Sequence, residues 1–182
     1  VTGESSAFVI MSCNNEPSLF NRIMLVNPSS IQSFAQTPNK NTKLYKLILD
    51  LPIVGTLLYN IASSRTVIEQ MFKEQYFNNP YSARSAYIDH YFEAAHLGEC
   101  PKAVFASLTC NYTKCNVVNA LKKIDNSIYI LGGKESSNME EIAQEYQMYN
   151  SAIEYSLIPK TKHLPQLENP EKVLDAVNIF FS

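Results

Sequence analysis

The chain opens with Val1-Thr2-Gly3-Glu4-Ser5-Ser6-Ala7, and the interpretation of the whole sequence starts from this stretch. The pattern Gly-x-Ser-x-small, followed by an apolar run, is typical of a sharp turn from a strand into a helix that exposes the serine. A large side chain two positions from Ser5 would collide with the backbone, and Gly3 and Ala7 are both small. The turn puts Ser5 at a helix amino end, where free N–H groups favour negative charge. Ser5 is therefore a candidate nucleophile, and an ordinary helix-capping serine is the alternative.

Helix and strand signals alternate after this stretch. Residues 6–14 are apolar on nearly all sides, as in a buried helix, and Arg22–Pro28 is a short apolar run closed by proline. Such a run predicts a central parallel strand that is covered on both faces. The chain begins inside what we interpret as the last residues of a strand, so we expect it to be a fragment or a processed product.

The middle of the chain, from residue 29 to about 113, has the character of helices joined by polar connectors. Pro52 marks one helix start, and Pro101 marks another. Residues 82–97 are expected to form the longest helix, ended by Gly98 in the left-handed conformation that a helix C-terminus favours. The sequence therefore predicts a long all-helical insertion.

Strand signals return in the last third of the chain. Ser127–Leu131 and Ala152–Ile158 are expected strands, and a helix is expected over 139–148 between them. Asn169-Pro170-Glu171 combines a capping residue, a proline and a first-turn acid, which predicts the start of a final helix. This alternation predicts an α/β fold with a parallel sheet, interrupted once by the helical block.

Composition excludes several classes of protein. The 182 residues are 46% apolar and 18% charged, which favours a folded domain over disorder. The net charge of -2 gives no basic surface for nucleic acid, and no apolar run is long enough to span a bilayer. The four cysteines are Cys13, Cys100, Cys110 and Cys115, and they show no CxxC or zinc spacing. We expect reduced thiols and a cytoplasmic location, with no cofactor or metal.

Three polar residues follow expected strands at points where a parallel sheet gathers functional groups. Ser5 follows the truncated first strand, Glu135 follows Leu131, and His163 follows Ile158. A serine is a weak nucleophile until an imidazole takes its proton, and a carboxylate on the other ring nitrogen holds the imidazole in the required tautomer. The order serine, acid, histidine is the one expected of a hydrolase with this kind of sheet.

At these residues the sequence resembles the α/β hydrolases. The stretch 3–7 is similar to the nucleophile elbow, 130–135 to the strand-Gly-x-x-acid segment, and 163–171 to the terminal His-x-x-x-x-Glu-x-Pro-Glu segment. The helical block, with Leu57-Leu58-Tyr59 and Ser64-Arg65, resembles the lid of the esterase and chlorophyll-derivative-hydrolase-like branch.

This resemblance implies the C-terminal part of an α/β-hydrolase sheet with an inserted all-helical cap, the N-terminal strands being absent from this chain. Residues 1–30 and 113–182 would form a partial hydrolase core, and 31–112 the cap. Ser5 would be the nucleophile, His163 the base, Glu135 the acid, and the Ser6 backbone N–H one oxyanion donor. The loop that supplies the second donor does not occur in the sequence, and losing one donor costs roughly a hundred- to a thousandfold in rate.

Each assignment has a plainer alternative. His163 could be a surface histidine, and Glu135, like Glu140 and Glu141 near it, could be solvated surface charge. His90 and His96 lie six residues apart on one helix, so they do not share a face and a metal site is not expected.

The expected function is hydrolysis of an apolar small-molecule ester through an acyl-serine intermediate. Two alternatives are lyase or haloperoxidase-type chemistry on the same fold, and a non-catalytic fragment that binds its missing N-terminal half.

Overall fold

The computed structural model describes residues 1–98 and 101–182, which divide into two compact units. Unit 1 contains Val1–Ala35, Tyr76–Asn78 and Cys115–Ser182, and unit 2 contains Gln36–Gln75 and Asn79–Lys114. Residues 31–35 and 76–78 lie in unit 1, and residues 113–114 lie in unit 2. The identification of the two units with a hydrolase core and a cap stays a prediction.

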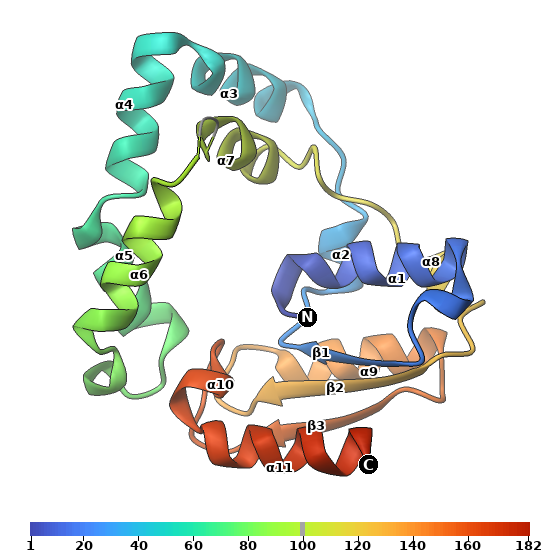
Figure 1. Ribbon diagram of the computed structural model, residues 1–182. Helices are drawn as coiled ribbons and strands as arrows, with labels where there is room; N and C mark the ends of the chain where they lie inside the picture. Colours follow the sequence, from blue (N-terminus) through green and yellow to red (C-terminus); the bar gives the residue numbers. More distant parts are fainter. Residues whose placement is uncertain (99–100) are drawn as a thin grey trace. The chain divides into compact units, whose positions relative to one another are not determined.

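Unit 1 alternates strands with helices, as the sequence predicts (Figure 1). Its elements are η1 (Gly3–Ser5), α1 (Ser6–Asn15), η2 (Pro17–Leu19), β1 (Arg22–Val26), α2 (Ile31–Phe34), α8 (Val118–Leu121), β2 (Ser127–Gly133), α9 (Met139–Tyr149), β3 (Glu154–Ile158), α10 (Pro165–Glu168) and α11 (Pro170–Phe181). The strands form a parallel sheet in the order β1-β2-β3.

The first two residues of the chain lie along the free edge of β1. Thr2 forms a parallel bridge with Val26, and the Val1 amino group donates a hydrogen bond of 2.9 Å to the Met24 carbonyl. Val1 and Thr2 therefore extend the sheet by one bridged position beside β1.

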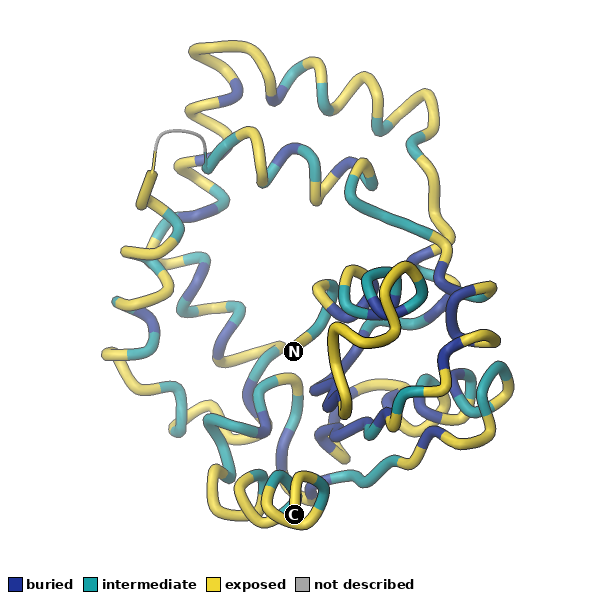
Figure 2. Tube along the Cα trace, turned by 45° about the vertical axis from the view of Figure 1, so that its right-hand side comes forward, coloured by how far each residue is buried: buried dark blue, intermediate teal, exposed yellow. Residues whose placement is uncertain are grey.

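Opposite faces of the sheet are covered by different helices. Because side chains alternate along a strand, Leu25 and Ile130 face the cluster that contains α1, α8 and α9, while Met24 and Leu131 pack with α11. β1 and β2 are mostly buried, whereas β3 is mostly half-buried (Figure 2). Burying one such aliphatic side chain contributes roughly 1.5–3 kcal/mol, which explains why continuous apolar runs form these strands.

Unit 2 is entirely helical among its described residues. Its elements are α3 (Lys40–Asp50), α4 (Pro52–Ala62), α5 (Arg65–Met71), η3 (Phe72–Tyr76, whose last residue belongs to unit 1), η4 (Pro80–Ser82), α6 (Ser85–Ala95) and α7 (Pro101–Thr109). The helix predicted over 82–97 is confirmed but shorter: Pro80 starts a separate 3-10 turn, α6 spans only 11 residues, and the 12 residues of α11 make it longer. Gly98 has φ +88°, the left-handed conformation expected for it.

Aromatic contacts and small buried residues hold unit 2 together. The Tyr59 ring meets Phe105 edge-on at 5.4 Å between centroids, and Phe72 meets Tyr91 at 4.8 Å. Gly55 lies directly on the Leu49 backbone: a Cβ at Gly55 would be 1.8 Å from the Leu49 carbonyl oxygen. The glycine therefore permits α3 and α4 to approach closely.

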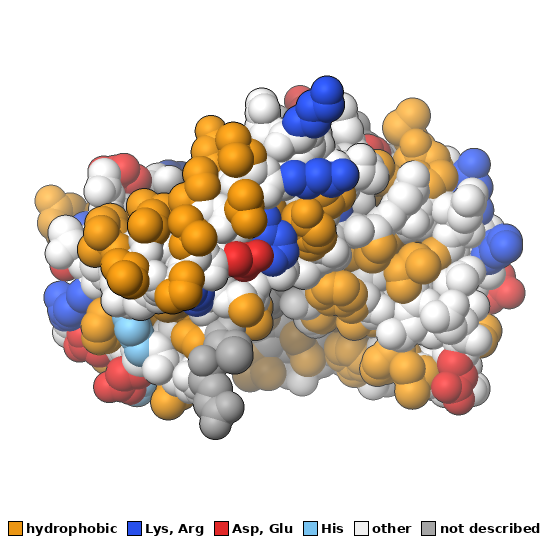
Figure 3. Space-filling view, turned by 90° about the horizontal axis from the view of Figure 1, so that it is seen from above, with side chains coloured by type: hydrophobic (Ala, Val, Ile, Leu, Met, Phe, Trp, Pro, Cys, Tyr) orange, Lys and Arg blue, Asp and Glu red, His pale blue; other side chains and the backbone are white. Residues whose placement is uncertain are grey.

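No single described helix is long and apolar enough to cross a bilayer, although α3 and α4 taken together, bent by 100°, have the necessary length and composition. Large apolar side chains gather on the exposed surface of these two helices (Figure 3). Cys13, Cys110 and Cys115 are free thiols, and Cys100 lies outside the described residues.

Candidate active site

The carboxyl ends of the parallel strands lie at one edge of the sheet, and each is followed by a loop with a polar residue. Ser5 follows the Val1–Thr2 segment, Asn27 follows β1, Glu135 follows β2 and His163 follows β3. In an open parallel sheet this edge is where ligands bind.

Ser5 ends the short turn η1 and is the residue before α1. It is exposed, and its backbone has the ordinary right-handed helical conformation, with φ -66° and ψ -14°. The positive φ in this turn belongs to Gly3, at +53°. The Ser5 hydroxyl makes no capping hydrogen bond, so the structure gives no support to the alternative of a helix-capping serine.

The backbone N–H of Ser6, the expected oxyanion donor, is engaged within the turn. It donates to the carbonyl oxygens of Gly3 and Glu4. In this conformation the N–H points back into η1, so it would stabilise an oxyanion only after the turn rearranges. The Ser6 side chain is buried, and its hydroxyl has no partner among residues 1–98 and 101–182.

Asn27 connects the ends of all three strands. Its side-chain oxygen accepts a hydrogen bond of 2.8 Å from the Gly133 N–H, and its side-chain nitrogen donates one of 2.8 Å to the Lys162 carbonyl. The residue is buried and has φ +42°, a conformation that asparagine tolerates better than most residues. The sequence does not predict this function of Asn27, because nothing in the run Arg22–Pro28 indicates which groups the amide would contact.

The loops that carry Glu135 and His163 are joined through their backbones. The Glu135 N–H donates to the Thr161 carbonyl at 2.9 Å. A Cβ on Gly133 would lie 1.9 Å from the Lys162 carbonyl oxygen, so only glycine allows the two loops to approach this closely. The two predicted residues therefore lie on adjacent, mutually anchored loops.

The Oγ atom of Ser136 lies 3.4 Å from the Nδ1 atom of His163. Ser136 is buried, whereas Glu135 is exposed. Within the described chain, no hydrogen bond joins the Glu135 carboxylate to His163, and none joins Ser5 to His163. The sequence pattern does not single out Ser136, because two adjacent glycines can begin the Gly-x-x segment. If the segment begins at Gly132, the residue after it is Glu135, and if it begins at Gly133, that residue is Ser136.

The environment of His163 favours a neutral imidazole. His163 is exposed, but partial desolvation of its ring by neighbouring residues lowers the pKa of His163 below its ordinary value, and the positive charge of Lys162 lowers it further. The Tyr76 ring stands edge-on to the imidazole, with 6.1 Å between the ring centroids. The Tyr76 backbone carbonyl accepts a hydrogen bond of 3.1 Å from the backbone N–H of His163. A neutral imidazole is the form that can accept a proton from a serine.

Glu168 holds the backbone on both sides of the loop that carries His163. Its carboxylate accepts the N–H of Asn78 at 2.8 Å and the N–H of Lys162 at 2.7 Å. The residue before His163 is thus held by a charge-assisted hydrogen bond.

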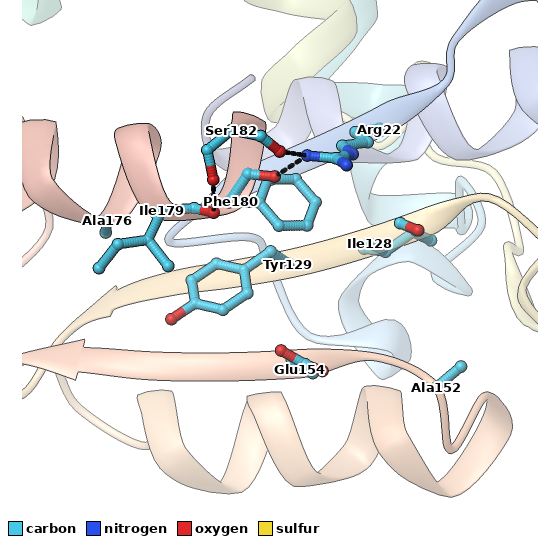
Figure 4. Close-up of a pocket in the computed structure, with 10 residues that line it drawn as sticks. Arg22, Ile128, Tyr129, Ala152, Glu154, Ala176, Ile179, Phe180 and Ser182 are labelled. Carbon is cyan, nitrogen blue, oxygen red and sulfur yellow. Dashed lines mark hydrogen bonds between the residues drawn. The ribbon is translucent and has the colours of Figure 1, made fainter.

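The cavities of unit 1 differ in position. One cavity of about 350 Å³ lies at the amino ends of the strands and is lined by Arg22, Tyr129, Glu154 and the end of α11 (Figure 4). The Arg22 guanidinium there donates hydrogen bonds to the carbonyls of Phe180 and Ser182. Another, of about 410 Å³, is an open cavity at the carboxyl edge beside Ser136. Ser136 lines the second cavity, and neither of the two is lined by Ser5, Glu135 or His163. In the described part of the chain, no three His, Cys, Asp or Glu side chains are arranged to hold a metal ion.

Solved structures with the same arrangement of elements identify the fold. Cfl2 from Burkholderia cenocepacia matches with a TM-score of 0.72 and 14% identity, over 100% of this chain and 64% of its own length. The 2-hydroxy-6-oxo-6-phenylhexa-2,4-dienoate hydrolase of Rhodococcus sp. strain RHA1 matches at 0.70 and 13%, over 99% and 62%. A carboxylesterase structure from Nitrososphaera gargenis matches at 0.64 and 16%, over 99% and 63%. No protein-family model and no curated protein matches the chain.

The resemblance to the α/β hydrolases is therefore confirmed at the level of the fold. The chain has the fold of the C-terminal part of such a protein and spans slightly less than two thirds of the length of these three structures. Identities of 13 to 16% carry the likeness no further than the fold.

Proposed function

We propose that the chain is part of a serine hydrolase that cleaves a carboxylic ester or a related acyl bond. Ser5 attacks the carbonyl carbon, His163 accepts the hydroxyl proton and returns it to the leaving alcohol, and water then releases the acyl group from Ser5. Glu135 is proposed as the acid that stabilises the imidazolium, and the Ser6 N–H as one oxyanion donor, once the turn η1 has rearranged. The proposed substrate is a small apolar ester, and no cofactor is needed for this reaction.

The observation that carries the proposal is the environment of His163 at the carboxyl edge of the sheet. Its lowered pKa favours the neutral form near neutral pH, and the loop that holds it is anchored by Asn27, Gly133 and Glu168. A histidine with a fixed backbone at this edge, in the fold of a hydrolase, is suited to act as a general base. Free thiols at Cys13, Cys110 and Cys115 support the further proposal of a reducing, cytoplasmic environment.

A fluorophosphonate probe tests the proposal, because it reacts with a serine only when that serine is activated. We expect the intact mass of the chain to increase by one phosphonyl group, and peptide mapping to place the group on Ser5. Ser5→Ala and His163→Gln should both abolish the reaction, whereas Ser151→Ala, a change at another exposed serine, should not.

The incubation must detect a reaction about a thousandfold slower than that of an ordinary esterase, since one oxyanion donor can account for such a factor. If no label reaches Ser5 under these conditions in a chain with native circular dichroism, Ser5 is not the nucleophile. Label on Ser5 that survives His163→Gln would exclude His163 as the base.

A further inference from the structure

Helices α3 and α4 carry a large exposed apolar surface, which we call the α3–α4 apolar face. It comprises the exposed side chains Leu44, Tyr45, Leu47, Leu51, Ile53, Val54, Leu57, Leu58 and Ile61. Ile53 is 83% exposed and Leu47 is 62% exposed. Figure 3 shows hydrophobic side chains gathered on this part of unit 2, with lysine side chains beside them. Eight large side chains on two adjoining helices, with Leu51 between them, exceed the scattered exposure that is normal for a protein surface.

Helical spacing explains why these residues share one surface. On α4, the positions of Val54, Leu57 and Ile61 recur at three and seven residues, and therefore lie on one side of the helix. The buried residues of α4, Gly55 and Tyr59, lie on the other side. The apolar side of α4 is thus additional to the side that packs within unit 2.

The positive charge of unit 2 is concentrated on the same segment. Residues 40–62 contain three lysines (Lys40, Lys43 and Lys46) and one acid, Asp50, which gives +2. The rest of unit 2 contains five basic and five acidic residues and is neutral. Lys46 pairs with Asp50 at 2.7 Å, while Lys40 and Lys43 have no acidic partner within 4 Å among the described residues. Two available lysines therefore adjoin an apolar surface.

We propose that the α3–α4 apolar face docks on an anionic phospholipid membrane. The two helices lie in the interface, with apolar side chains such as Ile53 and Leu57 among the acyl chains, and with Lys40 and Lys43 at the level of the headgroups. Apolar side chains combined with lysines are the composition of helices that bind anionic lipid surfaces. The bend of 100° between α3 and α4 lets both helices contribute to one contact.

Charge also argues against a second copy of the chain as the occupant. A two-fold symmetric interface would bring the same surface of both copies together, and with it the unpaired lysines of both. Like charges would then meet in a desolvated contact, which is unfavourable. Membrane docking does not depend on the chemistry proposed for Ser5.

Flotation of the chain with lipid vesicles tests the proposal. One set of vesicles is pure phosphatidylcholine, and the other contains about 30 mol % phosphatidylserine, an anionic lipid of cytoplasmic leaflets. We expect the chain to float with the anionic vesicles at least tenfold more strongly than with the neutral ones. Ile53→Glu combined with Leu57→Glu should reduce this partitioning at least tenfold.

Two further double variants test the contribution of the lysines and control for the effect of added negative charge. Lys40→Gln combined with Lys43→Gln should reduce partitioning into the anionic vesicles about thirtyfold, because each lysine near such a surface contributes roughly a fivefold increase. Met148→Glu combined with Ile179→Glu introduces the same charges at sites that are 84% and 78% exposed in unit 1, and should change partitioning less than twofold. Circular dichroism establishes that all variants fold.

The other possible occupants give different results, and each would overturn the proposal. A dimer that the Ile53→Glu and Leu57→Glu variant dissociates, without vesicle binding, would identify a second copy as the partner. A monomer that binds neither kind of vesicle would mean that the apolar face is covered within the chain or by another protein. Equal binding to both kinds of vesicle would remove the role of Lys40 and Lys43.

Discussion

Replacing Asn27 tests whether the carboxyl edge of the sheet depends on a single side chain. Asn27→Gly deletes the amide but keeps the φ of +42° accessible, because glycine adopts positive φ readily. The change removes the hydrogen bonds to the Gly133 N–H and to the Lys162 carbonyl, both 2.8 Å long. The perturbation is therefore the loss of two hydrogen bonds, with no added backbone strain.

The size of the effect follows from burial. The bond to Gly133 is buried and the bond to Lys162 is partly buried, so the deletion leaves one buried N–H and one partly buried carbonyl without their partner. Each unsatisfied group costs about 1–3 kcal/mol when buried, and we expect a total loss of about 2–4 kcal/mol. Asn27→Ala should cost about 1 kcal/mol more, since a residue with a Cβ is strained at positive φ.

Urea unfolding followed by circular dichroism measures these differences in the free energy of unfolding. The matched control is Asn138→Gly. Asn138 has φ +58°, is exposed and makes no capping hydrogen bond with its side chain, so its replacement should change stability by less than about 0.5 kcal/mol. If Asn27→Gly is as neutral as the control, Asn27 does not hold the three strand ends together.

Three further predictions concern the loops after β2 and β3. Ser136→Ala should change the pKa and the tautomer of His163 in an NMR titration, because Ser136 Oγ lies 3.4 Å from Nδ1; an unchanged titration would mean that this contact does not influence the imidazole. Gly133→Ala should prevent native folding, or cost more than about 3 kcal/mol in urea unfolding, since its Cβ would lie 1.9 Å from the Lys162 carbonyl oxygen; a stable Gly133→Ala chain would contradict this close approach. The pKa of His163 is lowered in the folded state, so the unfolded state binds more protons below about pH 6.5. The contribution of His163 to the free energy of unfolding should therefore be fully present above about pH 6.5 and decrease as the pH falls below it. His163→Gln should flatten this part of the pH profile, and an unchanged slope would show that another group causes it.

The sequence predicts the sheet well, because the signals for its elements are local. Continuous apolar runs place β1 and β2 within one or two residues of their observed ends, and Asn169-Pro170-Glu171 predicts the start of α11. Each of these patterns reflects burial or capping inside one short segment, which needs no knowledge of the rest of the chain.

The contacts at the carboxyl edge are not local, and sequence alone does not predict them. The Asn27 side chain makes hydrogen bonds with Gly133 and Lys162, which are separated from it by 106 and 135 positions in the sequence. No spacing rule connects an asparagine after one strand to a glycine in another. The turn at Ser5 is a second feature that the sequence predicts only in part. The motif predicts a sharp turn with an exposed serine, and the serine is exposed, but the positive φ belongs to Gly3 and the Ser6 N–H bonds within the turn.

Contacts to the backbone around His163 determine its position, and the Glu135 carboxylate takes no part in them. Gly133 allows the loop after β3 to approach, Asn27 and Glu168 fix Lys162, and the Tyr76 carbonyl binds the His163 N–H. None of these contacts uses a side chain at position 135 or 136. Changes at those two positions can therefore alter the proton affinity of the imidazole while its loop stays in place, so the chemistry at this edge can vary without a change in the fold.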